Sequence, residues 1–261
     1  MATFEQEHTV SGDTVNTLQI TSPGNASGTG LAIVVMAAQR NVTYTITSST
    51  GHTWTMVRDG SVGGQIGGQT TYVYSTPVTS GSAPNFTSTW AAPIAAGDML
   101  LKYFNIIGAT TVHDGDEDTE TQTEGAVAVT LTSDLVDEGF DASTAEVIVS
   151  TGLESPVAGA ADQGFADFMH TYSARFTEGA ILATLVSAAQ GRAEHIQMMY
   201  DLDPAAPSAG AESVSGTTNN VAGTAQVRYG SIRLLFDRVA RGSGGWSWHN
   251  GEPRWQVVRG M

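Results

Sequence analysis

Residues 51–90 read GHTWTMVRDG, SVGGQIGG, QTTYVYSTPV, TSGSAP and NFTSTW, and this stretch decides the class of fold. Runs rich in Thr, Val and aromatic residues are separated by segments of Gly, Ser and Pro, which is the pattern of β-strands joined by turns. Hydrophobic residues alternate within the runs, so that Tyr72 and Tyr74 fall on one face of a strand and Val73 falls on the other. The stretch therefore predicts a β-meander with one aromatic face buried.

The same pattern continues on both sides of this stretch. Residues 31–37, LAIVVMA, form a continuous apolar run, which is typical of a strand buried on both faces. Residues 165–176 and 180–189 fit either a helix or a strand, and we favour strands because their neighbours are strands. Further strands are expected at residues 14–20, 41–48, 98–107, 126–131, 146–151, 196–202 and 224–239. About a dozen short strands without a long helix predict an all-β protein, an antiparallel β-sandwich or jelly roll with extended N- and C-terminal arms.

Composition divides the chain into a body and two arms. Its 261 residues allow one large β-sandwich or two small domains, and they are enough for a real hydrophobic core. The expected parts are an N-terminal arm at residues 1–10, a β-sandwich domain at residues 11–239, and a glycine hinge with a Trp-rich C-terminal arm at residues 240–261. Because tryptophan side chains on a terminal arm need a surface to pack against, we predict that the arm binds a partner. The predicted partner-binding residues are Trp246, Trp248 and Trp255.

The charge of the chain excludes several classes of partner. The formal net charge is −15, from 11 basic and 26 acidic residues, so the protein should be repelled by nucleic acid and by anionic membranes. The chain has no cysteine, which excludes disulfides and thiolate metal sites. We expect no signal peptide, because residues 1–10 lack a basic and an apolar region, and no membrane helix, because no run of about 18 apolar residues is present.

Residues 112–125 are the most acidic segment, and we expect them to form an exposed loop because they lack apolar periodicity. Clustered carboxylates on a loop can supply the oxygen ligands that Ca²⁺ requires. The alternating carboxylates are those of Asp114, Asp116, Asp118 and Glu120. The EF-hand pattern, however, needs Gly and Glu at positions where this chain has Thr119 and Gly125. We therefore expect a solvated loop and no cofactor, with bound calcium as the alternative.

No motif with a catalytic mechanism is present, and we expect the protein not to be an enzyme. An acid pair such as Asp137–Glu138 could perform glycosidase chemistry, but that depends on a spacing between carboxylates that the sequence does not give. Aromatic residues of the strands could bind sugar by stacking, although their alternation favours a place in the core. These aromatic residues are Trp54, Tyr72, Tyr74 and Trp90.

Taken in order, several segments resemble the β-sandwich modules of bacteriophage virions. The order is SGDTVNTLQITSP with the apolar strand that follows it, then GHTWTMVR, YVYSTPV and a Phe-Thr-Ser-Thr-Trp strand, and last a closing strand after the Gly-Thr-rich SGTTNNVAGT. The resemblance covers residues 11–239. Related modules occur in head decoration proteins, tail fibres and other appendages of tailed phages, and the resemblance implies no catalytic residue.

From this resemblance we expect a structural component of a phage particle. The first expectation is a capsid decoration or cement protein on the outer surface of the virion, which forms a homo-oligomer and contacts a major capsid or other virion protein. The first alternative is a tail-fibre module that binds a receptor or a carbohydrate. A glycan-degrading enzyme and a cytosolic β-sandwich without a virion role are further alternatives.

Overall fold

The computed structural model describes residues 2–39, 43–62, 69–90, 97–113, 117–123, 129–135, 145–156, 169–187, 192–202, 212–218, 224–238, 244–249 and 252–257. Every helix or strand assigned within these ranges is a β-strand, which confirms the all-β class. None of the described segments is a helix of the length and apolarity that crossing a membrane requires.

The chain up to residue 107 forms two antiparallel sheets, the first central sheet and the first outer sheet. The strands of the first central sheet are β1 (Thr3–Val15), β3 (Gly30–Gln39), β5 (Thr55–Val62), β6 (Gln69–Val78) and β8 (Gly97–Ile107), in the spatial order β1-β8-β3-β6-β5. Those of the first outer sheet are β2 (Thr17–Thr21), β4 (Tyr44–Thr47) and β7 (Asn85–Trp90), in the order β2-β7-β4.

The chain from residue 109 to residue 238 forms a second central sheet and a second outer sheet. The strands of the second central sheet are β9 (Ala109–His113), β10 (Glu117–Thr123), β12 (Ala145–Pro156), β14 (Thr177–Glu178), β15 (Ala183–Ser187), β16 (Arg192–Asp201) and β18 (Thr224–Arg238). Their order is β10-β18-β12-β16-β14, with β9 beside β18 and β15 beside β16. The second outer sheet has the order β11-β17-β13, from strands β11 (Val129–Leu135), β13 (Met169–Thr171) and β17 (Glu212–Thr218).

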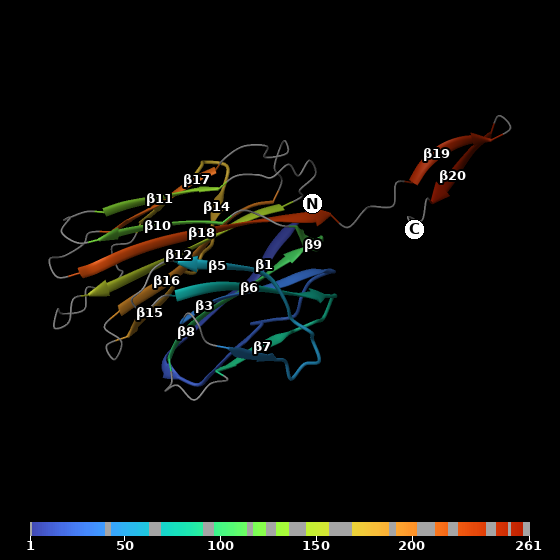
Figure 1. Ribbon diagram of the computed structural model, residues 1–261. Coiled ribbons are helices and arrows are strands. Elements are labelled where there is room, and N and C mark those ends of the chain that lie inside the picture. The colour runs from blue at the N-terminus through green and yellow to red at the C-terminus, as the bar shows by residue number, and fades with distance from the viewer. Residues whose placement is uncertain are drawn as a thin grey trace.

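The sheets stack as four layers, with a hydrophobic core between each pair of neighbours. Figure 1 shows β7 on one side of the body, β11 and β17 on the other, and the two central sheets between them. Each half of the chain is thus a two-layer sandwich, and the two sandwiches pack back to back. The antiparallel sandwich is confirmed, whereas the jelly-roll order of strands is not, because each central sheet takes its strands from one half of the chain.

Strand β3 shows how a central sheet is buried on both faces. The side chains of residues 31–38 are all buried. Because side chains alternate along a strand, Ile33 and Val35 pack in the core between the two central sheets, while Val34 and Met36 pack against the first outer sheet. The predicted strand with two buried faces is confirmed.

The aromatic stretch of residues 51–90 is divided between two sheets. Strands β5 and β6 pair in the first central sheet, whereas β7 pairs with β2 and β4, so the predicted meander is wrong. The aromatic rings meet in the gap between these sheets, where the ring centroid of Phe86 lies 5.1 Å from that of Tyr74 and 5.3 Å from that of Trp54. Tyr72 packs against the same core and Trp90 is buried, which confirms that these aromatic residues belong to the interior.

The two predicted arms differ from each other. Residues 3–10 are extended, but they are part of β1, which pairs with β8 along its whole length. They do not form a separate arm, because Phe4 packs into the protein with its ring centroid 4.4 Å from that of Tyr200. At the C-terminus, β19 (Gly244–His249) and β20 (Glu252–Val257) form a hairpin that pairs with no other described strand (Figure 1).

A single residue, Gly108, carries the chain from the first central sheet to the second. Strand β8 ends at Ile107 and β9 begins at Ala109. Gly108 has a φ of 91°, in the left-handed region that favours glycine. Its N–H donates a hydrogen bond of 2.9 Å to the carbonyl oxygen of Thr29, which fixes this corner to the chain just before β3.

We expect Gly108→Ala to lower the free energy of unfolding by about 1–2 kcal/mol, because a Cβ atom is disfavoured in the left-handed region. Chemical denaturation measures the change. Gly51→Ala is the matched control, since Gly51 also has a positive φ of 78° but lies in an exposed turn with nothing within 4 Å of an added Cβ. The exposed turn can relax, so the control should lose less; an equal loss in both variants would contradict the special role of the corner.

Candidate functional site

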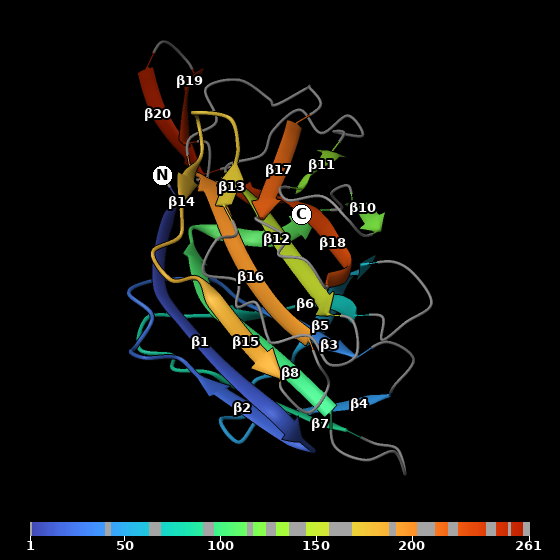
Figure 2. The same ribbon diagram turned by 90° about the vertical axis from the view of Figure 1, so that its left-hand side faces the viewer.

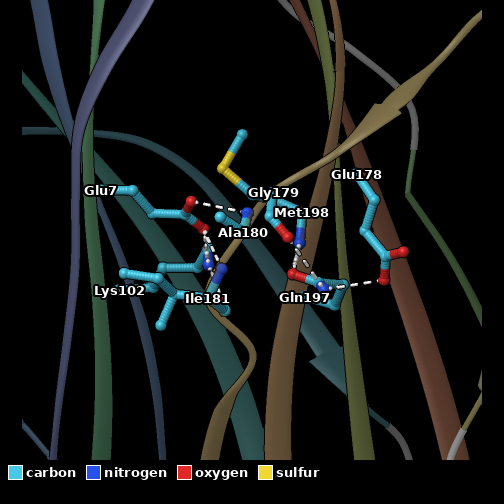
Figure 3. Close-up of polar contacts among 8 residues, drawn as sticks. All are labelled: Glu7, Lys102, Glu178, Gly179, Ala180, Ile181, Gln197 and Met198. Atoms are coloured by element: carbon cyan, nitrogen blue, oxygen red, sulfur yellow. Dashed lines mark hydrogen bonds and ion pairs between the residues drawn. The ribbon is translucent and has the colours of Figure 1, made fainter.

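Polar groups gather around Lys102, at the junction between the two central sheets (Figure 3). Lys102 is the only lysine in the chain and lies in the middle of β8. Because side chains alternate, it shares a face with Leu100 and Phe104, which belong to the core between the central sheets. Its side chain is 0% exposed, so its charge needs partners inside the protein.

The partners of Lys102 come from β1 and from the segment between β14 and β15. Its ammonium group donates hydrogen bonds to Oε1 of Glu7 and to the backbone carbonyl oxygen of Ile181. The Glu7 carboxylate also accepts hydrogen bonds from the backbone N–H groups of Ala180, at 2.8 Å, and Ile181, at 3.2 Å. Figure 2 shows β15 running alongside β1, and Figure 3 shows these four residues as one group. Through these backbone hydrogen bonds, the Lys–Glu pair of the first central sheet is tied to the segment that leads into β15 of the second central sheet.

A β-bulge in β1 places Glu7 in this position. The register of β1 against β8 shifts between Glu5 and His8, so that Gln6 and Glu7 together lie opposite one residue of β8. Gln6 has a φ of 61°, in the left-handed region that residues other than glycine seldom adopt. Bulges re-aim side chains, and this one directs Glu7 toward the second central sheet.

A second bulge repeats the arrangement further along β1. The register shifts again between Gly12 and Val15, and Thr14 has a φ of 54°. The carboxylate of Asp13 accepts a hydrogen bond of 2.8 Å from Oγ of Ser187, the last residue of β15. Strand β1 is thus fixed to β15 and the segment before it at two points, in each case by a carboxylate within a bulge.

Further hydrogen bonds continue from this group into β16 (Figure 3). Nε2 of Gln197 donates to the Glu178 carboxylate at 2.8 Å, and its Oε1 accepts from the N–H of Met198 at 2.9 Å. The N–H of Gly179 donates to the carbonyl oxygen of Met198 at 2.8 Å. A Cβ atom on Gly179 would lie 2.7 Å from Oε1 of Glu7, so a glycine is needed for this close approach.

Burial dominates the electrostatics of the group around Lys102. It lowers the pKa of Lys102, while the hydrogen bond and charge of Glu7 and the charge of Glu178 act in the opposite direction. The attraction within a buried ion pair repays only part of the cost of removing both charges from water. What the pair fixes is position, because both charges find all these partners only when β1 and the segment before β15 meet in this register.

A second ionic cluster lies on the opposite face of the second central sheet. Arg175, between β13 and β14, contacts the carboxylates of Glu146 at 2.8 Å, Asp201 at 3.1 Å and Glu212 at 2.7 Å. The other carboxylate oxygen of Glu146 accepts a hydrogen bond of 2.6 Å from Nε of Arg233. The planar guanidinium group suits this role, because its several N–H donors can bridge more than one carboxylate.

The cluster joins the second central sheet to the second outer sheet, since Glu212 belongs to β17 and Glu146 to β12. Glu146 and Asp201 lie directly opposite each other in the pairing of β12 with β16, where like charges repel. Arg175 bridges them and removes this repulsion. Burial lowers the pKa of Arg175, but the hydrogen bonds and charges of Glu146 and Glu212 outweigh it and raise the pKa overall.

Both clusters are networks of ion pairs and hydrogen bonds within the chain, and the Arg175 side chain remains 26% exposed. Their carboxylates face ammonium, guanidinium or backbone N–H groups of the same chain, and Lys102 is too deeply buried to meet a molecule from outside. Within the described ranges, no group of three or more His, Asp or Glu side chains could hold a metal ion. The chemistry of these clusters is to hold strands and layers in position.

The acidic segment is not a loop over the part that the structure describes. Residues 109–113 form β9 and residues 117–123 form β10, so the prediction of an exposed loop at residues 112–125 is wrong there. Threonine recurs along β10, and threonine is favoured in strands. Strand β10 pairs with β18 through backbone hydrogen bonds, which do not require apolar alternation along the strand.

The structure places two of the four carboxylates considered for calcium. Asp118 and Glu120 are in β10, opposite Ser231 and Tyr229 of β18. They are two residues apart in a strand, at positions on one face of the sheet. Outside the described residues lie Asp114, Asp116, Asp137 and Glu138.

The predicted partner-binding tryptophans all fall in the C-terminal hairpin. Trp246 and Trp248 are in β19 and Trp255 is in β20. The register sets Trp246 opposite Trp255, and Trp248 opposite Pro253. Residues that are directly opposite or two apart share one face of a hairpin, so the pairing brings all three tryptophan positions to the same face.

Sequence reasoning did not identify Glu7, Lys102 or Arg175. One signal was available for Lys102, because a lone lysine inside the apolar run at residues 98–107 must be paired when the strand is buried. No comparable signal marks Glu7, whose position depends on the bulge. No protein-family model, curated protein or solved structure matches this chain, so its function has to be argued from its own architecture and sequence.

Removing one partner of the Glu7–Lys102 pair should lower the stability strongly, because the remaining charge is left buried without its partner. Glu7→Leu leaves a buried ammonium group and Lys102→Met leaves a buried carboxylate, so each is expected to lower the free energy of unfolding by about 3–5 kcal/mol. The double variant should lose much less than the sum of the two single losses. Chemical denaturation of the four proteins measures this coupling, and additive losses would contradict it.

Amine labelling supplies the control for this experiment. Because Lys102 is the only lysine and is buried, an amine-reactive reagent should label the folded protein at the N-terminal amine alone. Lys102 should become labelled after denaturation, as mass spectrometry of its peptide would show. Labelling of Lys102 in the folded protein would mean that the pair is open to solvent.

Alkaline pH should destabilise the protein through two buried tyrosines. Burial raises the pKa of Tyr103 and of Tyr229 to about 12, from the ordinary value of 10.0. Between these pH values the folded protein keeps phenol protons that the unfolded chain has lost, so this stabilisation is complete below pH 10 and declines as the pH rises toward 12. Each tyrosine contributes about 1–3 kcal/mol to that decline.

We expect Tyr103→Phe and Tyr229→Phe each to flatten the fall of stability in this pH range, whatever their effect at neutral pH. Urea denaturation at a series of pH values measures the slope. The ultraviolet absorbance of tyrosinate should show late ionisation of at least two of the seven tyrosines, and each Phe variant should remove one late-ionising group. Ionisation of all seven together near pH 10 would contradict the assignment.

Proposed function

We propose that this protein is a structural component of a bacteriophage particle, a capsid decoration protein displayed on the outer surface of the virion. It acts by assembly and not by catalysis. Support for the phage assignment comes from the resemblance of residues 11–239 to virion β-sandwich modules. Its partners are further copies of the same chain and a major capsid or other virion protein.

The observation that carries the assembly role is the C-terminal hairpin. Among the described strands, β19 and β20 pair only with each other. An isolated two-stranded hairpin is marginally stable in water. Three tryptophan positions share one of its faces, and burying such residues contributes about 25 cal/mol per Å² of apolar surface removed from water. A hairpin of this kind is stabilised by docking on a partner.

The body of the protein supports a scaffold role over a catalytic or sugar-binding one. The described ionic clusters pair acidic with basic groups of the same chain and link its strands and layers. The aromatic residues that could have stacked on a sugar, such as Tyr74 and Trp90, are packed inside the sandwich. The net charge of −15 favours a protein partner over nucleic acid or an anionic membrane.

Substitution of the hairpin tryptophans tests this proposal. We expect Trp246→Ser/Trp255→Ser to weaken self-association, or co-sedimentation with purified capsids of the encoding phage, by at least about tenfold, which corresponds to about 1.4 kcal/mol. Sedimentation velocity of the full chain, alone and with capsids, measures both. The sandwich should unfold at an unchanged temperature, because the hairpin pairs with no other described strand.

The matched control is Ser247→Ala/Gln256→Ala, because these residues hold the alternate positions of the same two strands. This control should assemble as the parent does. If the tryptophan variant assembled and bound capsids as well as the parent, the hairpin would not be the docking element. Absence of the protein from purified phage particles, and of binding to them, would contradict the virion role.

A further inference from the structure

Among the described residues, the first outer sheet and the segments next to it carry no charged side chain. Residues 14–39, 43–57 and 69–90, which include β2, β4 and β7, contain no Asp, Glu, Lys or Arg. The chain as a whole has a net charge of −15. The first outer sheet is therefore a neutral layer on one side of an acidic molecule.

The outward face of this sheet is an array of hydroxyl and amide side chains. Burial alternates along its strands, with residues such as Ile20 and Phe86 turned inward to the core. The outward residues are Thr17, Gln19, Thr21, Thr45, Thr47, Thr87 and Thr89. Pairing aligns them in two rows across the sheet, Thr17–Thr89–Thr45 and Gln19–Thr87–Thr47. Within the first row, Oγ1 of Thr17 donates to Oγ1 of Thr89 at 3.3 Å.

This face also lacks the charges that usually keep sheets apart. Soluble proteins protect edge strands with charged side chains, proline, bulges or short strands. Strands β2 and β4 are the edges of this sheet, and among these devices they use only shortness, with 5 and 4 residues. Charged residues make up 14% of the whole chain, and mixed surface charge helps to keep soluble proteins from associating, so a face without any charge calls for an explanation.

We propose that this uncharged face, the outward side of β2, β7 and β4, is an interface between two copies of the chain that pack face to face about a two-fold axis. Two molecules of net charge −15 repel each other wherever their acidic surfaces meet. Contact through the first outer sheet brings no charge of the described residues together. Threonine suits a self-complementary contact, because its hydroxyl both donates and accepts and its methyl group packs.

The loops at one end of the sheet enlarge this surface. A stable interface buries about 800 Å² on each partner, which is more than the three short strands provide. The loop after β2 and the loop before β7 are joined by hydrogen bonds from the N–H of Ser22 to Pro84, at 3.0 Å, and from the N–H of Ala26 to Ser82, at 2.7 Å. These loops are uncharged too, so the neutral surface extends over them.

A second copy is favoured over a neutral polysaccharide as the occupant. Sugar rings are held largely by stacking on exposed aromatic side chains, and the aromatic residues of this layer turn inward, as Phe86 and Trp90 do. The inference rests on the proposed function in one respect, because a decoration protein associates with itself. It adds the surface through which that association occurs.

Charges placed on the face test this interface in the full chain. We expect Thr89→Lys, in the central strand, and Thr45→Lys, in an edge strand, each to weaken self-association at least tenfold, as measured by sedimentation velocity over a concentration series. Both side chains point outward, so the thermal unfolding temperature should change little. Mixing Thr89→Lys with Thr89→Glu should restore association, because opposite charges then meet across the interface.

Thr184→Lys is the matched control, since Thr184 is an exposed threonine in β15 of the second central sheet and should tolerate the charge. A parent protein that stays monomeric at every concentration would overturn the inference, as would lysine variants that associate like the parent. Equal weakening by Thr184→Lys would also overturn it, because the effect would then be one of charge in general. Retention of a monomeric parent on immobilised dextran that Thr89→Lys abolishes would assign the face to a glycan instead.

The proposal for the hairpin and the proposal for the uncharged face can be contradicted independently of each other. Loss of association in Trp246→Ser/Trp255→Ser with none in Thr89→Lys or Thr45→Lys would leave the proposed function standing and overturn the interface. Loss in the lysine variants alone would support the interface and remove the hairpin from self-association.

Discussion

Burial of both faces of the two central sheets is the constraint on which the rest of the structure depends. Strands β3 and β8 are buried on both sides and mostly apolar, so each needs a covering layer above and below. The first outer sheet covers one side of the first central sheet, and the second central sheet covers the other. The second central sheet meets the same need with its own outer sheet, which carries Leu135 and Val214 into the third core. Four layers are the result of satisfying this requirement twice.

Charged groups inside such a stack have to find their partners on the neighbouring strand or layer. Lys102 points from β8 into the core between the central sheets and is met by Glu7 and by the backbone of residues 180–181. On the far side of the second central sheet, Arg175 gathers three carboxylates and joins a third sheet to the second. Each cluster forms all its contacts in one register only, so together the clusters set the position of each layer relative to its neighbour. Hydrophobic burial, which has no direction, holds the layers together without fixing that position.

Local patterns in the sequence predicted most of the strands, because alternation and turn residues are local signals. They did not predict pairing: the alternation of residues 85–90 says which side chains turn inward, but nothing in it selects β2 and β4 over β6 as neighbours. The contact between Glu7 and Lys102 spans 95 residues and depends on the bulge at Gln6. A glycine often marks a bulge with a positive φ, but Gln6 gives no such signal in the sequence. Strand β10 was missed for a related reason, since its pairing uses the backbone of an acidic, threonine-rich segment. The tryptophans were recognised as a group, and only the register of the hairpin set them on one face.

The corner at Gly108 separates the two sandwiches in their order of synthesis as well as in the structure. Every strand of the first central and first outer sheets precedes it, and every strand of the second pair follows it. On the ribosome, the N-terminal sandwich therefore has all its pairing partners before β9 has been made. Its uncovered face, with Ile33, Val35 and Phe104, then stays in water until β12, β16 and β18 emerge. At translation rates of about 5–20 residues per second, that wait is on the order of ten seconds. Because exposed apolar surface promotes aggregation, we expect this face to be where two unfinished chains on neighbouring ribosomes adhere to each other.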